Sequence, residues 1–366
     1  NNLTCLALAV VLAGLVSCNL GPRTVKIGVA GPMTGPNAKQ GNDFLNGVQL
    51  AVEEWNARGG ALGKKVEVVP VDDRSDPKEA VMAANKLVNQ GVAGVIGHYE
   101  SSCSIPASVI YFEAGVVQIT PSSTNSDLTL KEKRSTIFRA CGRDDQQAYF
   151  DAQYVREVLK KKRVAIIDDK TTYGQGLAKD FQKNLGPEVK VVAYENLQRG
   201  DRDFSPILTK IKPLNPEVIF FGGYYTEAGL LVTQMRRLGM KAIFVSGDAT
   251  IDQEFLNIAG KDAEGTYLSY GPDVEKLESA RKFMESYTAK YGPIGPYSLY
   301  AYDAANVLLK GIELAKSAEG SKIARAIHGM VFSGARGDLA FDENGDLRNI
   351  PYVMWVVKNG KFESVK

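Results

Sequence analysis

The sequence predicts an α/β fold in which two doubly wound, Rossmann-like lobes are joined by a hinge of several crossovers. Apolar segments rich in Val and Ile alternate with amphipathic helices along most of the chain, which is typical of parallel strands buried on both faces. The alternation restarts after Cys141 and Gly142, and this restart indicates a second lobe rather than one larger sheet. The last third breaks the pattern with consecutive helices and short strands, so we expect it to return to both lobes.

In the first series, helix-capping and helix-ending residues mark the boundaries between strands and helices. Gly59 and Gly60 end the first helix near residue 58, because glycine adopts the left-handed cap conformation at little cost. Asp76 and Pro77 start the next helix, as N-cap and first helical residue. The strands expected in this series span residues 25–30, 66–71, 93–97 and 116–120.

The second series and the C-terminal segment define the expected domains. Strands are expected at 164–168, 189–194, 218–222, 243–246 and 266–269, with helices between them. Helices at 277–290, 299–315 and 324–328 precede short strands at 339–341 and 352–357. We expect one lobe to comprise residues 22–142 and 272–349, and the other to comprise 143–271 and 350–366. Several crossovers of this kind suit closure of two lobes around a ligand.

The N-terminus is typical of an export signal. Residues 3–16 form an apolar run that is too short to span a bilayer. The run ends in Leu15-Val16-Ser17-Cys18, which resembles a bacterial lipobox. We therefore expect residues 1–18 to be a signal peptide and Cys18 to be lipidated, although Cys18 is incidental if the signal is an ordinary one. The expected location is periplasmic or extracytoplasmic, with the protein free or lipid-anchored.

Composition argues against several classes of function. A net charge of +2 indicates no strong attraction to nucleic acid. Two histidines and no Cys-x-x-Cys motif argue against a metal site, and no nucleophile elbow, zinc-protease or P-loop motif is present. His98 follows a strand, but the sequence assigns it no acidic partner, so we expect a structural histidine. We expect no enzyme, no cofactor and no metal, and a disulfide between Cys103 and Cys141 once the protein is exported.

Polar residues gather where the expected strands end, and ligands of open parallel sheets bind at those ends. Hydroxyls mark the first lobe, and tyrosines with one acid, Asp248, mark the second. Such a set suits a zwitterion, with its carboxylate on one lobe and its ammonium on the other. The alternative is that the hydroxyls are helix caps, that the tyrosines pack the lobe surfaces and that Asp248 caps the helix near Ile251. The hydroxyl and tyrosine positions are Ser101, Ser122, Ser123, Thr124, Tyr173 and Tyr224.

At these residues the chain resembles the leucine/isoleucine/valine-binding protein family, the type I periplasmic substrate-binding proteins of branched-chain amino acid ABC transporters. The likeness covers residues 24–360. Its motifs include Asp72-Asp73, Ile119-Thr120-Pro121, Phe221-Gly222-Gly223-Tyr224, Ala263-Glu264-Gly265 and Phe341-Asp342. The resemblance implies a type I periplasmic binding protein fold that captures an amino acid, branched-chain or related, and delivers it to a membrane permease. It also implies a monomer.

The resemblance further implies a role for each matching residue. Ser101 and Thr124 correspond to hydroxyls that hold the ligand carboxylate, and Ser122 and Ser123 to residues whose main chain contacts the ligand. Asp248 corresponds to the acid that receives the ammonium. The aromatic residues that close the site or line its side-chain pocket correspond to Tyr173, Tyr224 and Tyr297.

Departures from the family pattern concern specificity. Gln40 stands where an aromatic residue is frequent, and Tyr99 and Glu100 stand where apolar or small residues are usual, which implies a more polar pocket. A disulfide of the family cannot form, because Ser75 and Glu100 hold its positions. Two other functions stay open: a ligand-sensing module of the same fold, and a binder of a small carboxylate that is not an amino acid.

Overall fold

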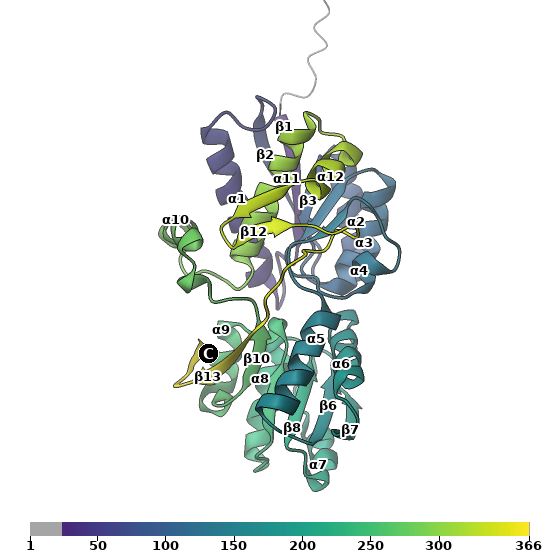
Figure 1. Cartoon of the computed structure of the whole chain (residues 1–366), viewed down its shortest axis with the longest axis vertical. Coiled ribbons are helices and arrows are strands. Elements are labelled where there is room, and N and C mark those ends of the chain that lie inside the picture. The colour runs from purple at the N-terminus through teal and green to yellow at the C-terminus, as the bar shows by residue number, and fades with distance from the viewer. Residues whose placement is uncertain (1–23, 366) are drawn as a thin grey trace, which may run out of the picture.

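A computed structural model describes residues 24–365 of the chain. The expected signal peptide and its Cys18 lie outside these residues. The described part forms two α/β lobes, one above the other in Figure 1. Each lobe is built on its own mainly parallel sheet with helices on both faces, so the predicted fold class is confirmed.

Lobe 1 contains a five-stranded parallel sheet in the order β2-β1-β3-β4-β5. Its strands are β1 (Thr24–Gly31), β2 (Lys65–Asp72), β3 (Gly94–Gly97), β4 (Val117–Thr120) and β5 (Ile137–Arg139). Its helices are α1 (Ala38–Ala57), α2 (Pro77–Asn89), α3 (Ser101–Glu113), α4 (Asp127–Leu130), α10 (Arg281–Tyr291), α11 (Ser298–Ala315) and α12 (Gly320–His328). A hairpin of β11 (Val331–Gly334) and β12 (Gly337–Ala340) completes this lobe.

Lobe 2 contains a seven-stranded sheet in the order β14-β13-β10-β9-β8-β6-β7. The strands are β6 (Arg163–Asp168), β7 (Lys190–Asn196), β8 (Val218–Gly222), β9 (Ile243–Ser246), β10 (Tyr267–Tyr270), β13 (Val353–Lys358) and β14 (Lys361–Ser364). The helices are α5 (Asp144–Gln153), α6 (Thr172–Asn184), α7 (Ser205–Ile211), α8 (Tyr225–Arg237) and α9 (Gln253–Ala259). The last two strands pair antiparallel and extend an otherwise parallel sheet.

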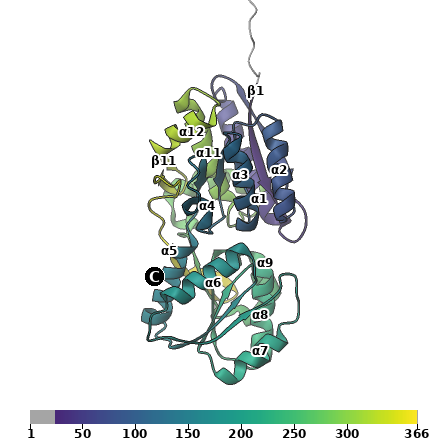
Figure 2. The same cartoon turned by 90° about the vertical axis from the view of Figure 1, so that its right-hand side faces the viewer.

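The chain passes between the two sheets three times: from β5 to α5, from β10 to α10 and from β12 to β13. Figures 1 and 2 show these connections side by side at the waist of the molecule. Arg139, at the end of β5, is fully buried and donates from Nε to Asp346 at 2.9 Å. This pair therefore ties the first crossover to the third.

Local sequence explains why the elements begin where they do. The Asp76 carboxylate accepts hydrogen bonds from the backbone N–H groups of Lys78 and Glu79 at 2.8 and 3.0 Å, as an N-cap does. Gly59 and Gly60 have positive φ angles and end α1. These observations confirm both predicted helix boundaries.

Other elements differ from the expectation. α4, β5, β11 and β14 were not expected, because each is short and lacks a clear period. α12 begins at Gly320 rather than near residue 324. His98 has an acidic partner after all, since its Nδ1 lies 2.6 Å from Asp73 Oδ2 in the core. Among residues 24–365 the structure contains no helix long and apolar enough to cross a bilayer.

Candidate functional site

The carboxyl ends of the strands of both lobes face each other and enclose a small cavity. Lobe 1 contributes residues after β3 and β4, lobe 2 contributes residues after β6, β8 and β9, and Tyr297 comes from the start of α11. The cavity measures about 10 Å³, room for about one water molecule. An amino acid therefore enters only if the lobes separate or the lining side chains turn. The lining residues are Tyr99, Ser101, Ser122, Tyr173, Tyr224, Asp248, Ala249 and Tyr297.

Some hydroxyls of lobe 1 form hydrogen bonds within the protein, whereas another could bind a ligand. Ser122 donates to the Tyr99 carbonyl at 2.8 Å, and Ser123 donates to the His98 carbonyl at 3.1 Å. The Ser123 amide is also occupied, because it donates to Thr120 Oγ1 at 2.9 Å. Ser123 thus braces the loop behind the cavity.

Of the two remaining hydroxyls, only that of Ser101 lines the cavity. Ser101 is the first residue of α3 and accepts from the Asn125 amide at 3.2 Å, which leaves its own proton free to donate. Thr124 is buried beside Asp144, whose pKa its side chain lowers against the effect of burial, and it does not line the cavity. The first turn of α3 adds unpaired backbone N–H groups, which favour an anion.

Asp248 supplies the acid on the wall of lobe 2. Its side chain is buried and accepts from Tyr297 at 2.6 Å and from Tyr173 at 3.1 Å. Burial raises the pKa of this carboxyl, while the hydroxyls of Tyr297 and Tyr173 and the amide of Gln147 act in the opposite direction. A cation placed beside Asp248 would stabilise the ionised form.

Asp248 does not serve as a helix cap. Its carboxylate accepts from the hydroxyls of Tyr297 and Tyr173, and the one backbone N–H that acts on it is its own. Asp252 caps the following α9 instead and accepts from Glu254 N at 2.8 Å. The alternative that the Asp248 carboxylate caps the helix near Ile251 is therefore wrong.

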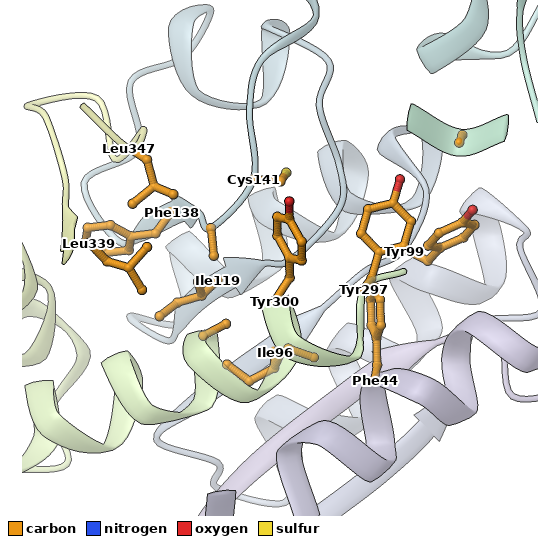
Figure 3. Packing of buried hydrophobic residues seen from close by; sticks show 14 of the residues in the cluster. Phe44, Ile96, Tyr99, Ile119, Phe138, Cys141, Tyr297, Tyr300, Leu339 and Leu347 are labelled. Atoms are coloured by element: carbon orange, nitrogen blue, oxygen red, sulfur yellow. The ribbon is translucent and has the colours of Figure 1, made fainter. Parts of the chain in front are cut away.

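Tyrosine rings form the remaining walls. The Tyr99 ring centroid lies 5.7 Å from that of Tyr297 and 6.0 Å from that of Tyr224, and Tyr173 lies 5.3 Å from Tyr224. Figure 3 shows Tyr99 and Tyr297 beside each other above Phe44, with the hydroxyls directed away from it. These rings join the two lobes into one apolar cluster.

The structure does not bring Gln40 and Glu100 to the cavity. Gln40 Nε2 donates to Asp252 Oδ2 of lobe 2 at 2.9 Å. Glu100 accepts from Asn37 and from Arg199 Nη1, each at 2.8 Å. Both side chains turn away because partners at the mouth of the cleft satisfy their polar atoms, so they link the lobes rather than line the cavity.

Two residues near the site were missed from the sequence. Gln147, on α5, donates to Ser269 and helps to hold Asp248. Arg199 follows β7 and reaches across the cleft. The position of Arg199 just after β7 is the sequence signal that could have identified it, because the carboxyl ends of parallel strands share one edge, whereas nothing local marks Gln147.

The predicted disulfide is wrong in this structure, because Cys103 and Cys141 are both free and buried. Cys103 lies on α3 near Glu100, whereas Cys141 follows β5 and its thiol faces the Ser123 carbonyl at 3.7 Å. The two thiols thus point into different surroundings. Residues 24–365 also contain no group of three or more His, Cys, Asp or Glu side chains arranged to hold a metal ion.

Comparison with known proteins assigns the family. The model of the periplasmic binding protein family matches residues 24–361. The chain belongs to the periplasmic binding protein family. Members of this family bind solutes outside the cytoplasm, so the predicted class, an extracytoplasmic substrate-binding protein, is confirmed.

Relatives of this periplasmic binding protein include an amino acid binding protein of Pseudomonas aeruginosa, 41% identical over 94% of each chain. The leucine-, isoleucine-, valine-, threonine-, and alanine-binding protein of the same organism is 37% identical and covers 95% of this chain and 93% of its own. A leucine binding protein of Thermotoga maritima superposes with a TM-score of 0.86 at 33% identity, over 93% of this chain and 98% of its own. A branched-chain amino acid transporter substrate binding protein of Streptococcus pneumoniae, solved with isoleucine, has the same TM-score at 32% identity, over 93% and 99%.

Proposed function

We propose that this periplasmic binding protein captures a zwitterionic amino acid, branched-chain or related, between its lobes and delivers it to the permease of an ABC importer. One observation carries the proposal. A buried carboxylate, Asp248, stands on one lobe across a tyrosine-lined cavity from the hydroxyl of Ser101 on the other lobe.

Each part of an amino acid has a complementary partner in this arrangement. The carboxylate is held by Ser101 and the first N–H groups of α3, and the main chain of Ser122 and Ser123 shapes the loop around it. The ammonium is held by Asp248. Tyr173 and Tyr224 close from lobe 2, while Tyr99 and Tyr297 contact the ligand side chain. The amino-acid names of the relatives support this ligand class.

The two opposite charges also explain how a ligand closes the lobes. A ligand stabilises the closed form only by the contacts that it gains on closing. A carboxylate bound mainly by lobe 1 and an ammonium bound mainly by lobe 2 gain such contacts together. A molecule with only one of the two charges engages one lobe and drives closure weakly.

Calorimetry with valine and two analogues that each lack one of its charged groups tests the proposal. Valine carries both charges, isovaleric acid lacks the ammonium and isobutylamine lacks the carboxylate. We expect valine or another aliphatic amino acid to bind, and the two single-charge analogues to bind at least about 30-fold more weakly, the effect of losing one charge partner. Binding of the acid alone would contradict the proposal and identify a carboxylate carrier.

Location and partners extend the proposal. We propose that Cys18 carries a lipid that tethers a monomeric protein to the outer side of the membrane. In cells fed an alkyne-labelled fatty acid, the parent should become labelled and Cys18→Ser should not. Labelling of neither would indicate a free periplasmic protein.

A further inference from the structure

An ion pair crosses the mouth of the cleft without touching the cavity. Glu100, the residue before α3 in lobe 1, lies 2.8 Å from Nη1 of Arg199, which follows β7 in lobe 2. The Glu100 side chain is 1% exposed and that of Arg199 is 24% exposed. Asn37 donates to the second oxygen of Glu100 at 2.8 Å. The acid is thus satisfied by protein donors and presents no free charge to a ligand.

The same guanidinium is stacked on a tyrosine of the site. Arg199 Cζ lies 4.3 Å from the ring centroid of Tyr224. A planar guanidinium combines a cation–π contact with stacking, which a lysine ammonium cannot reproduce. Arg199 thus contacts Glu100 of lobe 1 and the Tyr224 ring of lobe 2 at the same time.

Tyr224 separates two spaces. On one side is the small cavity with Ser101 and Asp248. On the other is a groove of about 630 Å³ at the mouth of the cleft, whose lining includes Arg199 and Arg202. Rotation of the Tyr224 ring would therefore join the cavity to the groove.

We infer that Arg199, held by Glu100, is a specificity-determining positioning residue. It fixes the Tyr224 ring as the wall between cavity and groove, and this wall limits the size of the ligand side chain. Pairing of Glu100 with Arg199 also leaves Glu100 without a free charge for a cationic ligand side chain. The inference rests on the proposed function, because it names which amino acids fit.

The test compares the ligand preference of Arg199→Ala, Arg199→Lys and Arg202→Ala with that of the parent. Arg202 lines the same groove and makes no ion pair or ring contact within residues 24–365, so it is a matched control. Calorimetry measures Kd for alanine, valine, leucine and phenylalanine. We expect Arg199→Ala to change the ratio of Kd for alanine to Kd for phenylalanine by at least tenfold in favour of phenylalanine. Arg199→Lys should lie in between, and Arg202→Ala should match the parent.

An equal loss of affinity for all four ligands would overturn the inference, because Arg199 would then only hold the lobes together. An unchanged ratio at unchanged affinity would overturn it as well. A crystal structure of ligand-free Arg199→Ala gives a readout that does not depend on the ligand: the Tyr224 ring should leave its place, and an unmoved ring overturns the inference. If the parent binds no amino acid, the proposed function fails separately, and the straight-chain acids from propionate to octanoate replace the amino acids in the size series.

Discussion

Asp248→Asn is the substitution that probes the site most directly. Asparagine has nearly the same shape as aspartate but no charge, and Asp248 is buried between two tyrosine hydroxyls. A ligand ammonium would lose its only charged partner in the cavity lining. Loss of one partner of a desolvated charge pair costs about 2–5 kcal/mol, or about 30- to several-thousand-fold in Kd.

The free protein should respond in the opposite direction. Burial raises the pKa of Asp248, so its ionised form is costly in the ligand-free state. Asparagine removes that cost, and we expect the free energy of unfolding at neutral pH to stay the same or to increase. Asp248→Glu keeps the charge and should retain more affinity than Asp248→Asn, although its extra methylene must displace a neighbouring ring.

Isothermal calorimetry as a function of pH and urea denaturation of the free protein together test this reasoning. Binding needs the Asp248 carboxylate, so affinity in the parent should weaken as pH falls through the raised pKa of this group. Asp248→Asn should lose that pH dependence. If Asp248→Asn keeps near-native affinity for an amino acid that the parent binds tightly, Asp248 does not hold the ammonium and the two-charge mechanism fails.

Three further perturbations report on the fold. Asp346→Asn leaves the buried Arg139 without its charge partner and should lower the free energy of unfolding by about 3–5 kcal/mol in urea denaturation; a loss below about 1 kcal/mol would place the pair among weak surface contacts. Burial raises the pKa of Asp169 to about 7, so between about pH 4 and 7 the folded protein holds a proton that the unfolded chain has released. The Asp169 proton by itself therefore lowers stability by about 1.4 kcal/mol per pH unit as pH rises through this window, and Asp169→Asn should remove this contribution. Burial also raises the pKa values of Cys103 and Cys141, so both thiols should resist labelling in the native protein and react in unreduced, denatured protein. If the denatured protein contains no reactive thiol, the two cysteines form a disulfide after all.

Local sequence determined much of the architecture. The Val/Ile runs specify buried parallel strands, and Asp76 with Pro77 specifies a helix start, because these features depend on contacts between residues close in the chain. The positions of Ser101, Tyr173, Tyr224 and Asp248 at strand ends follow from the same pattern, since parallel strands bring their carboxyl ends to one edge. Short elements such as β5 and β14 were not predicted, because a segment of a few residues is too short to show a hydrophobic period.

The connections across the cleft were decided only by the tertiary structure. Gln40 meets Asp252 across 212 residues, Glu100 meets Arg199 across 99, and Tyr297 meets Asp248 across 49. Such partners depend on how the lobes close and on the rotamer of each side chain, neither of which leaves a periodic signal. Glu100 illustrates the difference, since its presence next to the site can be read from the chain, whereas its direction depends on an arginine of the other lobe. The sequence therefore determined which groups stand at the strand ends, and the packing of the two lobes decided which of them face a ligand and which hold the lobes together.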